Sequence, residues 1–205
     1  MNLFQMALRG GILMGILLII SIVAFAIIIE RFIKLKKAKN GEQDFLKEVK
    51  TYLSENQTEQ ALRLCEIRSE NPIANVIYKG LQASDVGYNE TQQAVETAAN
   101  SEMHKLEKNL GTLSTFAAIS PLIGFLGTVT GMVKVFMNIS QTGGGVDISL
   151  LASGIYEALV TTIGGLTVGI IAILFYNYLV GKIEDIGNDL QEDSNEFLLN
   201  LRKTK

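Results

Sequence analysis

The sequence predicts an all-α integral membrane protein with three transmembrane helices, of which the second and third extend into a cytoplasmic helical bundle. Two observations carry this prediction. Of the 205 residues, 48% are hydrophobic, and the mean hydropathy of +0.27 is high for a soluble domain. The charge is also segregated, because residues 110–181 contain only Lys134, Asp147 and Glu157 as charged residues. A soluble globule spreads charge over its whole surface.

The composition argues against several classes of function. A net charge of −3 with no basic block in the polar region gives no reason to expect nucleic-acid binding. The single cysteine, Cys65, excludes an intramolecular disulfide and a cysteine-rich metal site, and we expect it to be a small buried hydrophobe. The single histidine, His104, stands among charged residues on an expected solvated helix face, without partners for zinc or for a nucleophile pair. We therefore predict no metal and no cofactor.

The first transmembrane helix is predicted over residues 10–30, after a short periplasmic segment of residues 1–9. Residues 10–29 are uncharged, and at 1.5 Å per residue they cover about 30 Å, the hydrocarbon thickness of a bilayer. A signal peptide would carry its basic residues before the apolar run. Here the basic cluster follows it, with Arg31, Lys34, Lys36, Lys37 and Lys39. The positive-inside rule makes this cluster a cytoplasmic anchor.

A cytoplasmic helical domain is predicted over residues 31–110. Three shorter helices are expected near residues 43–55, 58–69 and 73–85, with breaks at Asn71-Pro72 and at Gly87. From Thr91 to Leu110 the apolar residues recur at helical spacing. We therefore expect the second membrane helix to continue below the membrane through this stretch.

The second transmembrane helix is predicted over residues 111–138 and the third over residues 149–181. A glycine-rich periplasmic turn over residues 139–148 joins them, with Asp147 as the expected N-cap of the third helix. Three spans that start in the periplasm return residues 182–205 to the cytoplasm as a C-terminal helix or tail.

Both later spans carry stripes of small residues on one helix face. The first stripe consists of Gly124, Gly127 and Gly131, and the second of Gly154, Ala158, Thr161, Gly165 and Gly169. Small residues let helix backbones approach closely in a membrane, so we expect these faces to pack. Pro121 is expected to kink the second helix, with the hydroxyl of Ser120 compensating for the missing backbone hydrogen bond.

Polar side chains inside the spans leave alternatives open. A charge at the centre of a bilayer costs about 2.5–3.5 kcal/mol on insertion scales. Glu157 therefore either handles protons or snorkels and tethers a neighbouring helix, and for Lys134 we expect snorkelling. Hydroxyls either line a hydrated path or bond back to their own helix. These hydroxyls belong to Thr128, Thr130, Thr161, Thr162 and Thr167.

Two sequence blocks stand in order on the second and third spans. The first reads Pro121-Leu-Ile-Gly124-Phe-Leu-Gly127-Thr128-Val-x-Gly131, and the second reads Gly154-Ile-x-Glu157-Ala-Leu-Val-x-Thr162-x-x-Gly165-Leu. They resemble the MotA/TolQ/ExbB proton-channel family, and most closely its three-span ExbB and TolQ branch. The motor-stator MotA branch has four spans, and this chain has no fourth apolar run.

The resemblance implies a homo-pentamer in the lipid bilayer of the bacterial inner membrane, enclosing the single spans of an ExbD- or TolR-like partner. It implies that the assembly passes protons and uses the proton motive force to do mechanical work on a TonB- or TolA-like protein. Thr128 and Thr162 match positions that face the central pore in the family, and Glu157 matches a position close by. The proton-carrying aspartate of the family belongs to the partner, so this chain need not hold the primary acceptor.

Two other classes of function compete with this reading. A non-conducting membrane scaffold would recruit partners through its cytoplasmic bundle and would tolerate Glu157→Gln and Thr128→Val. A membrane-embedded hydrolase would need a Ser/His pair, two acids or a metal cluster in the spans. The spans offer the single acid Glu157 without a second carboxylate or a histidine, so we expect no enzymatic activity.

Overall fold

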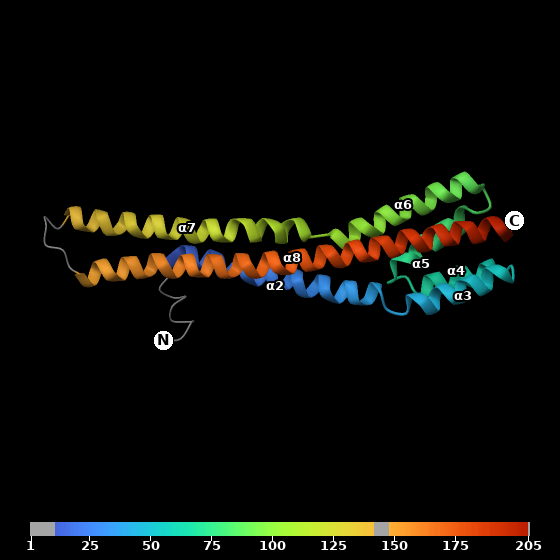
Figure 1. Ribbon diagram of the computed structural model, residues 1–205, viewed down its shortest axis with the longest axis horizontal. Coiled ribbons are helices and arrows are strands. Elements are labelled where there is room, and N and C mark those ends of the chain that lie inside the picture. Colours follow the sequence, from blue (N-terminus) through green and yellow to red (C-terminus); the bar gives the residue numbers. More distant parts are fainter. Residues whose placement is uncertain (1–10, 142–147, 205) are drawn as a thin grey trace. The chain divides into compact units, whose positions relative to one another are not determined.

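The computed structural model describes residues 11–141 and 148–204, and every secondary-structure element in these ranges is an α-helix. The helices are α2 (Gly11–Ala38), α3 (Glu42–Ser54), α4 (Thr58–Ile67), α5 (Pro72–Ala83), α6 (Tyr88–Glu107), α7 (Leu110–Gln141) and α8 (Ile148–Thr204) (Figure 1). The predicted all-α class is confirmed. The predicted N-terminal segment of residues 1–9 and the N-cap Asp147 lie outside the described residues.

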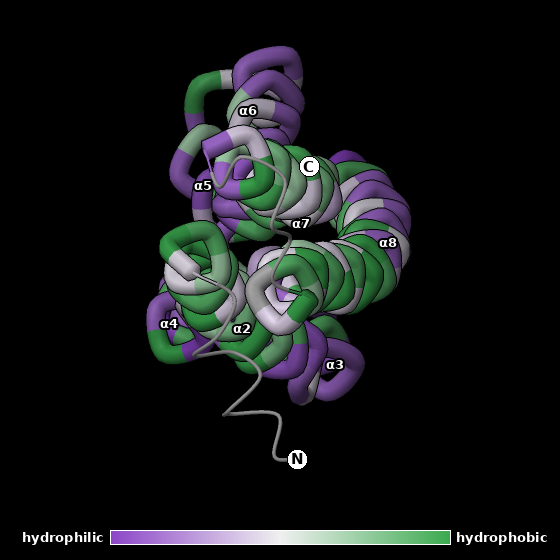
Figure 2. Tube along the Cα trace, turned by 90° about the vertical axis from the view of Figure 1, so that its left-hand side faces the viewer, coloured by the Kyte–Doolittle hydropathy of each residue, from purple (hydrophilic) through white to green (hydrophobic). Residues whose placement is uncertain are grey.

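Three helical stretches are long and apolar enough to cross a membrane. Their apolar windows fall in the stretches that contain α2, α7 and α8, which confirms the prediction of three candidate spans. In Figure 2 the tube of α2 is mostly green, whereas α3 and α6 carry much more of the hydrophilic purple. The start of the basic cluster does not end the first helix, since α2 continues past Arg31, Lys34, Lys36 and Lys37 to Ala38.

The chain divides into two compact units. The first, called here the apolar unit, comprises the described residues up to Ile29 together with Asn109–Tyr178, and the second, the polar unit, comprises Glu30–Lys108 and the described residues from Leu179 onward. In the apolar unit, α7 and the first part of α8 lie side by side (Figure 1).

The second membrane helix differs from the prediction of one helix that continues unbroken from Thr91. Helix α6 ends at Glu107, Lys108 takes an extended conformation with ψ 135°, and α7 starts at Leu110. Between them Asn109 has φ 66°, in the left-handed region that asparagine tolerates better than most residues. The helical spacing of apolar residues continues across this break, so the sequence pattern did not predict it. The third helix is continuous to Thr204, as predicted.

The short helices of the polar unit confirm the predicted positions to within two residues. Asn71 caps α5, because its Oδ1 accepts a hydrogen bond from the Ile73 N–H at 3.0 Å, and Pro72 occupies the first turn. Proline suits this position because its missing N–H would have no partner there. The hydrophobic core of this unit joins α3, α4, α5, α6 and the end of α8, with Phe45, Cys65, Ile77, Val95 and Phe197 among its buried members.

The cysteine and the histidine occupy the environments expected from the sequence. Cys65 is 1% exposed, and burial raises the pKa of its thiol to about 12. His104 is exposed and lies 3.7 Å from the Glu107 carboxylate on the same helix. Among the described residues, no three His, Cys, Asp or Glu side chains gather in a way that could hold a metal ion.

Candidate functional site: the α7/α8 seam

Helices α7 and α8 meet along their small-residue faces, a contact we call the glycine seam. A Cβ built on Gly124 would lie 3.1 Å from the Thr162 Cα and 3.2 Å from the Gly165 Cα, so backbone faces backbone here. One turn further along α7, a Cβ on Gly127 would lie 2.5 Å from the Thr161 Cγ2. Close backbone approach of this kind holds membrane helices together where apolar burial cannot.

The seam continues in both directions from this centre. Towards the C-terminus of α7, a Cβ on Gly131 would lie 2.8 Å from the Ala158 Cβ, and one on Gly154 would collide with Val135. Towards the N-terminus of α7, a Cβ on Gly169 would lie 2.7 Å from the Pro121 Cγ. The order of these contacts makes the two helices antiparallel.

Pro121 lies inside α7 and leaves one backbone carbonyl without its intrahelical N–H partner. The neighbouring Ser120 is fully buried, and its hydroxyl donates to the Phe116 oxygen at 2.6 Å rather than to another helix. The absence of a side chain at Gly169 leaves room for the proline ring. The kink predicted at Pro121 stays a prediction.

The threonine hydroxyls near the seam all donate to main-chain carbonyls. The Thr162 hydroxyl crosses the seam and donates to the Gly124 oxygen at 2.8 Å. The Thr128 hydroxyl donates within its own helix to the Phe125 oxygen at 2.6 Å. Thr130, Thr161 and Thr167 bond back in the same way. Four of these five hydroxyls therefore donate within their own helix. The hydroxyl of Thr162 donates to the other helix.

Thr128 and Thr162 lie along one edge of the seam, which we call the threonine edge. Thr162 contacts Gly124, and Thr128 stands one helical turn beyond Gly124 on α7. Both side chains are partly exposed. The structure therefore leaves this edge open to a neighbour of the hairpin.

Glu157 lies on a different side of α8. Its Oε1 is 3.7 Å from the Lys134 Nζ on α7 and 2.5 Å from a Cβ built on Gly11, the first residue of α2. Seven residues further on the same face of α8, a Cβ on Gly164 would lie 3.1 Å from the Met14 sulfur of α2. Thr162 is five residues after Glu157, about 140° further round the helix. The structure brings Glu157 to Lys134 and α2, and not to Thr128 and Thr162.

In the described part of the apolar unit, Lys134 and Glu157 are the charged residues. Their side chains are 70% and 36% exposed, respectively. Sequence reasoning did not predict that Lys134 and Glu157 contact each other. The presence of one basic and one acidic residue in two neighbouring apolar stretches could have indicated this pair. The pairing needs the register of α7 against α8, which the two glycine faces set.

The basic cluster after the first span is engaged in contacts within the polar unit. Arg31 is completely buried and donates from Nη1 to the main-chain oxygens of Lys105 and Leu106, at 2.9 and 3.2 Å. Ion pairs at about 3 Å join Lys34 to Glu30, Lys37 to Glu70 and Lys39 to Asp189, and Lys36 is exposed. Sequence reasoning missed the burial of Arg31 because it did not anticipate the end of α6 at Glu107.

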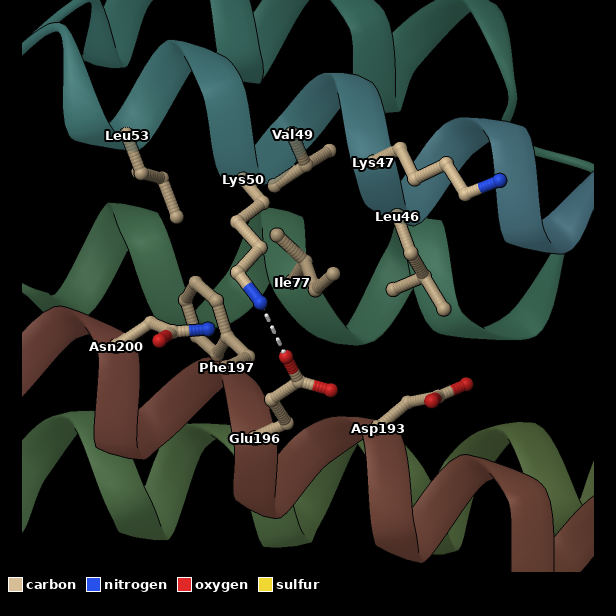
Figure 3. Close-up of a pocket in the computed structure, with 10 residues that line it drawn as sticks. All are labelled: Leu46, Lys47, Val49, Lys50, Leu53, Ile77, Asp193, Glu196, Phe197 and Asn200. Carbon is tan, nitrogen blue, oxygen red and sulfur yellow. Dashed lines mark hydrogen bonds and ion pairs between the residues drawn. The ribbon is translucent and has the colours of Figure 1, made fainter.

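A pocket of about 150 Å³ lies in the polar unit between α3, α5 and the end of α8 (Figure 3). Its lining combines apolar side chains such as Val49 and Phe197 with the ion pair of Lys50 and Glu196, whose atoms are 2.8 Å apart. Asp193 also lines it, and burial together with the nearby carboxylates of Asp189 and Glu192 raises its pKa to about 6. The pocket marks where the end of α8 packs on α3.

The chain is similar in sequence to known membrane proteins of one family. The sequence profile described as the MotA/TolQ/ExbB proton channel family matches residues 68–192, more than half of the chain. A protein of Methanothermobacter thermautotrophicus, named as an ExbB homolog of biopolymer transport, is 31% identical over 186 residues, which cover 90% of this chain and 65% of the relative. The chain thus spans just under two thirds of that relative's length.

Two bacterial relatives are covered almost completely. The biopolymer transport protein ExbB of Neisseria meningitidis is 27% identical over 204 residues, 93% of this chain and 90% of the relative. The Tol-Pal system protein TolQ of Haemophilus influenzae is 30% identical over 221 residues, 96% of this chain and 92% of the relative. The chain belongs to the MotA/TolQ/ExbB proton channel family, in its ExbB/TolQ branch.

Proposed function

We propose that this chain is an inner-membrane proton-channel and motor subunit, which converts the proton motive force into mechanical work on a TonB- or TolA-like protein. The work would serve outer-membrane transport or envelope maintenance. Family membership, three apolar helices and relatives named ExbB and TolQ support a membrane subunit that energises transport. The proposal assigns no catalytic chemistry to the chain.

The proposed assembly is a homo-pentamer around the single spans of an ExbD- or TolR-like partner. In this assembly the N-terminus is periplasmic, the C-terminus is cytoplasmic, and the polar unit forms the cytoplasmic bundle. The basic residues after the first span support this orientation through the positive-inside rule.

The observation that carries the proposal is the threonine edge of the glycine seam. Thr128 and Thr162 are partly exposed beside a backbone-to-backbone helix contact, so the edge presents two hydroxyl-bearing side chains next to the small residues of the seam. A partner helix that changes its rotation or register needs a neighbour without deep interlocking side chains. The proposed pore lies along this edge.

The energy available is of the right size for such a step. One charge that moves through the membrane releases about 2.3 kcal/mol per 100 mV. A few kcal/mol suffices to shift one helix between two discrete packings. The mechanical output then comes from the partner helix, and the glycine seam keeps the surrounding wall rigid.

The test replaces Thr162 with leucine in the complex with its partner and measures uptake that depends on the proton motive force. We expect uptake to fall by about tenfold or more, because a bulky side chain would fill the proposed pore edge. The matched control is Thr167→Leu, since the Thr167 hydroxyl also donates to a main-chain oxygen, that of Ile163 on α8, but Thr167 lies about 140° away from Thr162 round the helix. Normal uptake in a folded Thr162→Leu complex would refute the pore assignment and would favour a non-conducting scaffold.

A further inference from the structure

The apolar unit contains a charged contact that the threonine edge does not use. Lys134 near the C-terminal end of α7 and Glu157 near the N-terminal end of α8 approach to 3.7 Å. The neighbouring contacts of Gly131 with Ala158 and of Gly154 with Val135 fix the two helices on either side of the pair. The pair therefore stands at a place where the relative position of α7 and α8 has little freedom.

The same carboxylate also lies against the start of the first helix. A Cβ built on Gly11 would come within 2.5 Å of the Glu157 Oε1, so only a residue without a side chain fits there unless the carboxylate moves. Gly11 also has φ 65°, a conformation that favours glycine. The first N–H groups of a helix have no intrahelical partners and carry partial positive charge, which suits an anion. Glu157 thus contacts α2 and α7 from α8.

The energetic reason for the contact is mutual neutralisation. A lone charge within an apolar span is costly, and opposite charges within reach reduce that cost. In the described part of the apolar unit, Lys134 is the one basic residue and Glu157 is the one acidic residue. Each is therefore the one oppositely charged partner of the other. Among the described residues, loss of either one leaves the other without an oppositely charged neighbour in the apolar unit.

We propose that Lys134 and Glu157 form an ion pair that fastens the N-terminal end of α2 to the α7/α8 hairpin, which makes Glu157 a positioning residue rather than a group on the proton path. Its place on the side of α8 that faces α2, about 140° from Thr162, is the geometric ground. This role rests on the proposed function, because the hairpin that it holds carries the proposed pore edge. It also gives Lys134 a specific purpose.

The test exchanges the two charges in the assembled complex. Lys134→Gln and Glu157→Gln should each lower the thermal midpoint of the purified complex by about 3 °C or more, and should lower energy-dependent uptake by about tenfold. The double variant Lys134→Glu/Glu157→Lys should restore the midpoint and bring uptake to within about threefold of the wild type. Full recovery is not expected, because a cation beside the start of α2 is less favourable than an anion. Lys134→Arg should behave like the wild type.

A surface pair serves as the matched control. Lys182 and Asp185 are 3.1 Å apart and exposed on the polar part of α8, so their exchange should change neither readout measurably. Where a single variant at position 134 or 157 fails to assemble, recovery of assembly in the exchange variant supports the ion pair, and failure to recover refutes it. Recovery of the midpoint without uptake would show that Glu157 itself is needed for conduction and would overturn the positioning role.

The two proposals fail in different ways. If the wild-type complex shows no uptake that depends on the proton motive force, the proposed function is wrong, while the thermal midpoints still test the ion pair. If uptake depends on that force and the exchange variant is no more stable than the single variants, the ion pair is refuted and the proposed function stands.

Discussion

The guanidinium of Arg31 donates to the main-chain oxygen of Lys105 at 2.9 Å, so a completely buried cation of α2 binds the last turn of α6. The last carbonyls of a helix have no intrahelical donors, and a cation also compensates the partial negative charge at that end. The contact supplies hydrogen-bond donors to carbonyls at the end of α6.

Arg31→Ala should therefore destabilise the polar unit by about 1–3 kcal/mol, because the main-chain oxygens of Lys105 and Leu106 lose their charged donor. The measurement is thermal unfolding of the purified protein in detergent. Lys36→Ala is the matched control, because Lys36 is an exposed cation of the same helix. An unchanged midpoint in Arg31→Ala would contradict the assigned contact.

Gly165→Ala should destabilise the apolar unit by about 1–3 kcal/mol, the usual cost of overpacking. The new Cβ would collide with the Ser120 main-chain oxygen and would lie 2.8 Å from the Gly124 Cα, and backbone atoms cannot rotate away. Gly181→Ala is the control on the same helix, since a Cβ there meets no atom within 4 Å in the described residues. We expect it to be neutral or to stabilise by up to about 1 kcal/mol through helix propensity. Equal effects on the thermal midpoint would argue against close packing at the seam.

Asp193 predicts a pH dependence of the contact between α3 and the end of α8. Its pKa is raised from 3.8 to about 6, chiefly by burial and then by the carboxylates of Asp189 and Glu192. The folded state therefore binds the proton more tightly than the unfolded state, and stability falls as pH rises from about 4 to about 6. Glu42 on α3 also has a raised pKa, through burial and through Asp193 and Asp189.

Asp193→Asn should remove part of this dependence and raise the thermal midpoint at pH 7.5 more than at pH 4. The control is Glu59→Gln, which removes an exposed carboxylate of α4 that does not line the pocket. A midpoint for Asp193→Asn that follows the wild type at every pH would contradict the assignment.

Cys65 should resist alkylation in the native protein. Its thiol is buried and its pKa is raised to about 12, and the thiolate is the reactive form. Incubation with iodoacetamide at pH 8, followed by mass spectrometry, should leave the thiol unmodified until denaturant is added. Ser69→Cys, at an exposed position, should react in the same sample and serves as the positive control. Rapid native labelling of Cys65 would show that the core of the polar unit opens readily.

The sequence predicted well those features that depend on local chemistry. Asn71-Pro72 marks a helix start because the amide caps and the proline fits the first turn. The three spans follow from length and hydropathy alone. The glycine faces could be read from residue spacing, because a helix repeats its faces at intervals of three or four residues.

Features that depend on register between distant segments could not be predicted in this way. The approach of Lys134 to Glu157 follows from the contact of Gly131 with Ala158, which spacing within each helix does not fix. The burial of Arg31 depends on the helix break at Asn109. The helical spacing of apolar residues continues across this break, so the sequence pattern does not indicate it. Both cases join parts of the chain that no local rule connects.

The hydrogen bonds of Thr128 and Thr162 also determine what the threonine edge can offer to a neighbour. Each hydroxyl hydrogen is already directed to a main-chain oxygen, so only oxygen lone pairs remain available. A wall of this kind accepts hydrogen bonds without donating them. Water molecules beside it would turn their hydrogens towards the protein, and a hydrated cation would find a suitable surface where an anion would not.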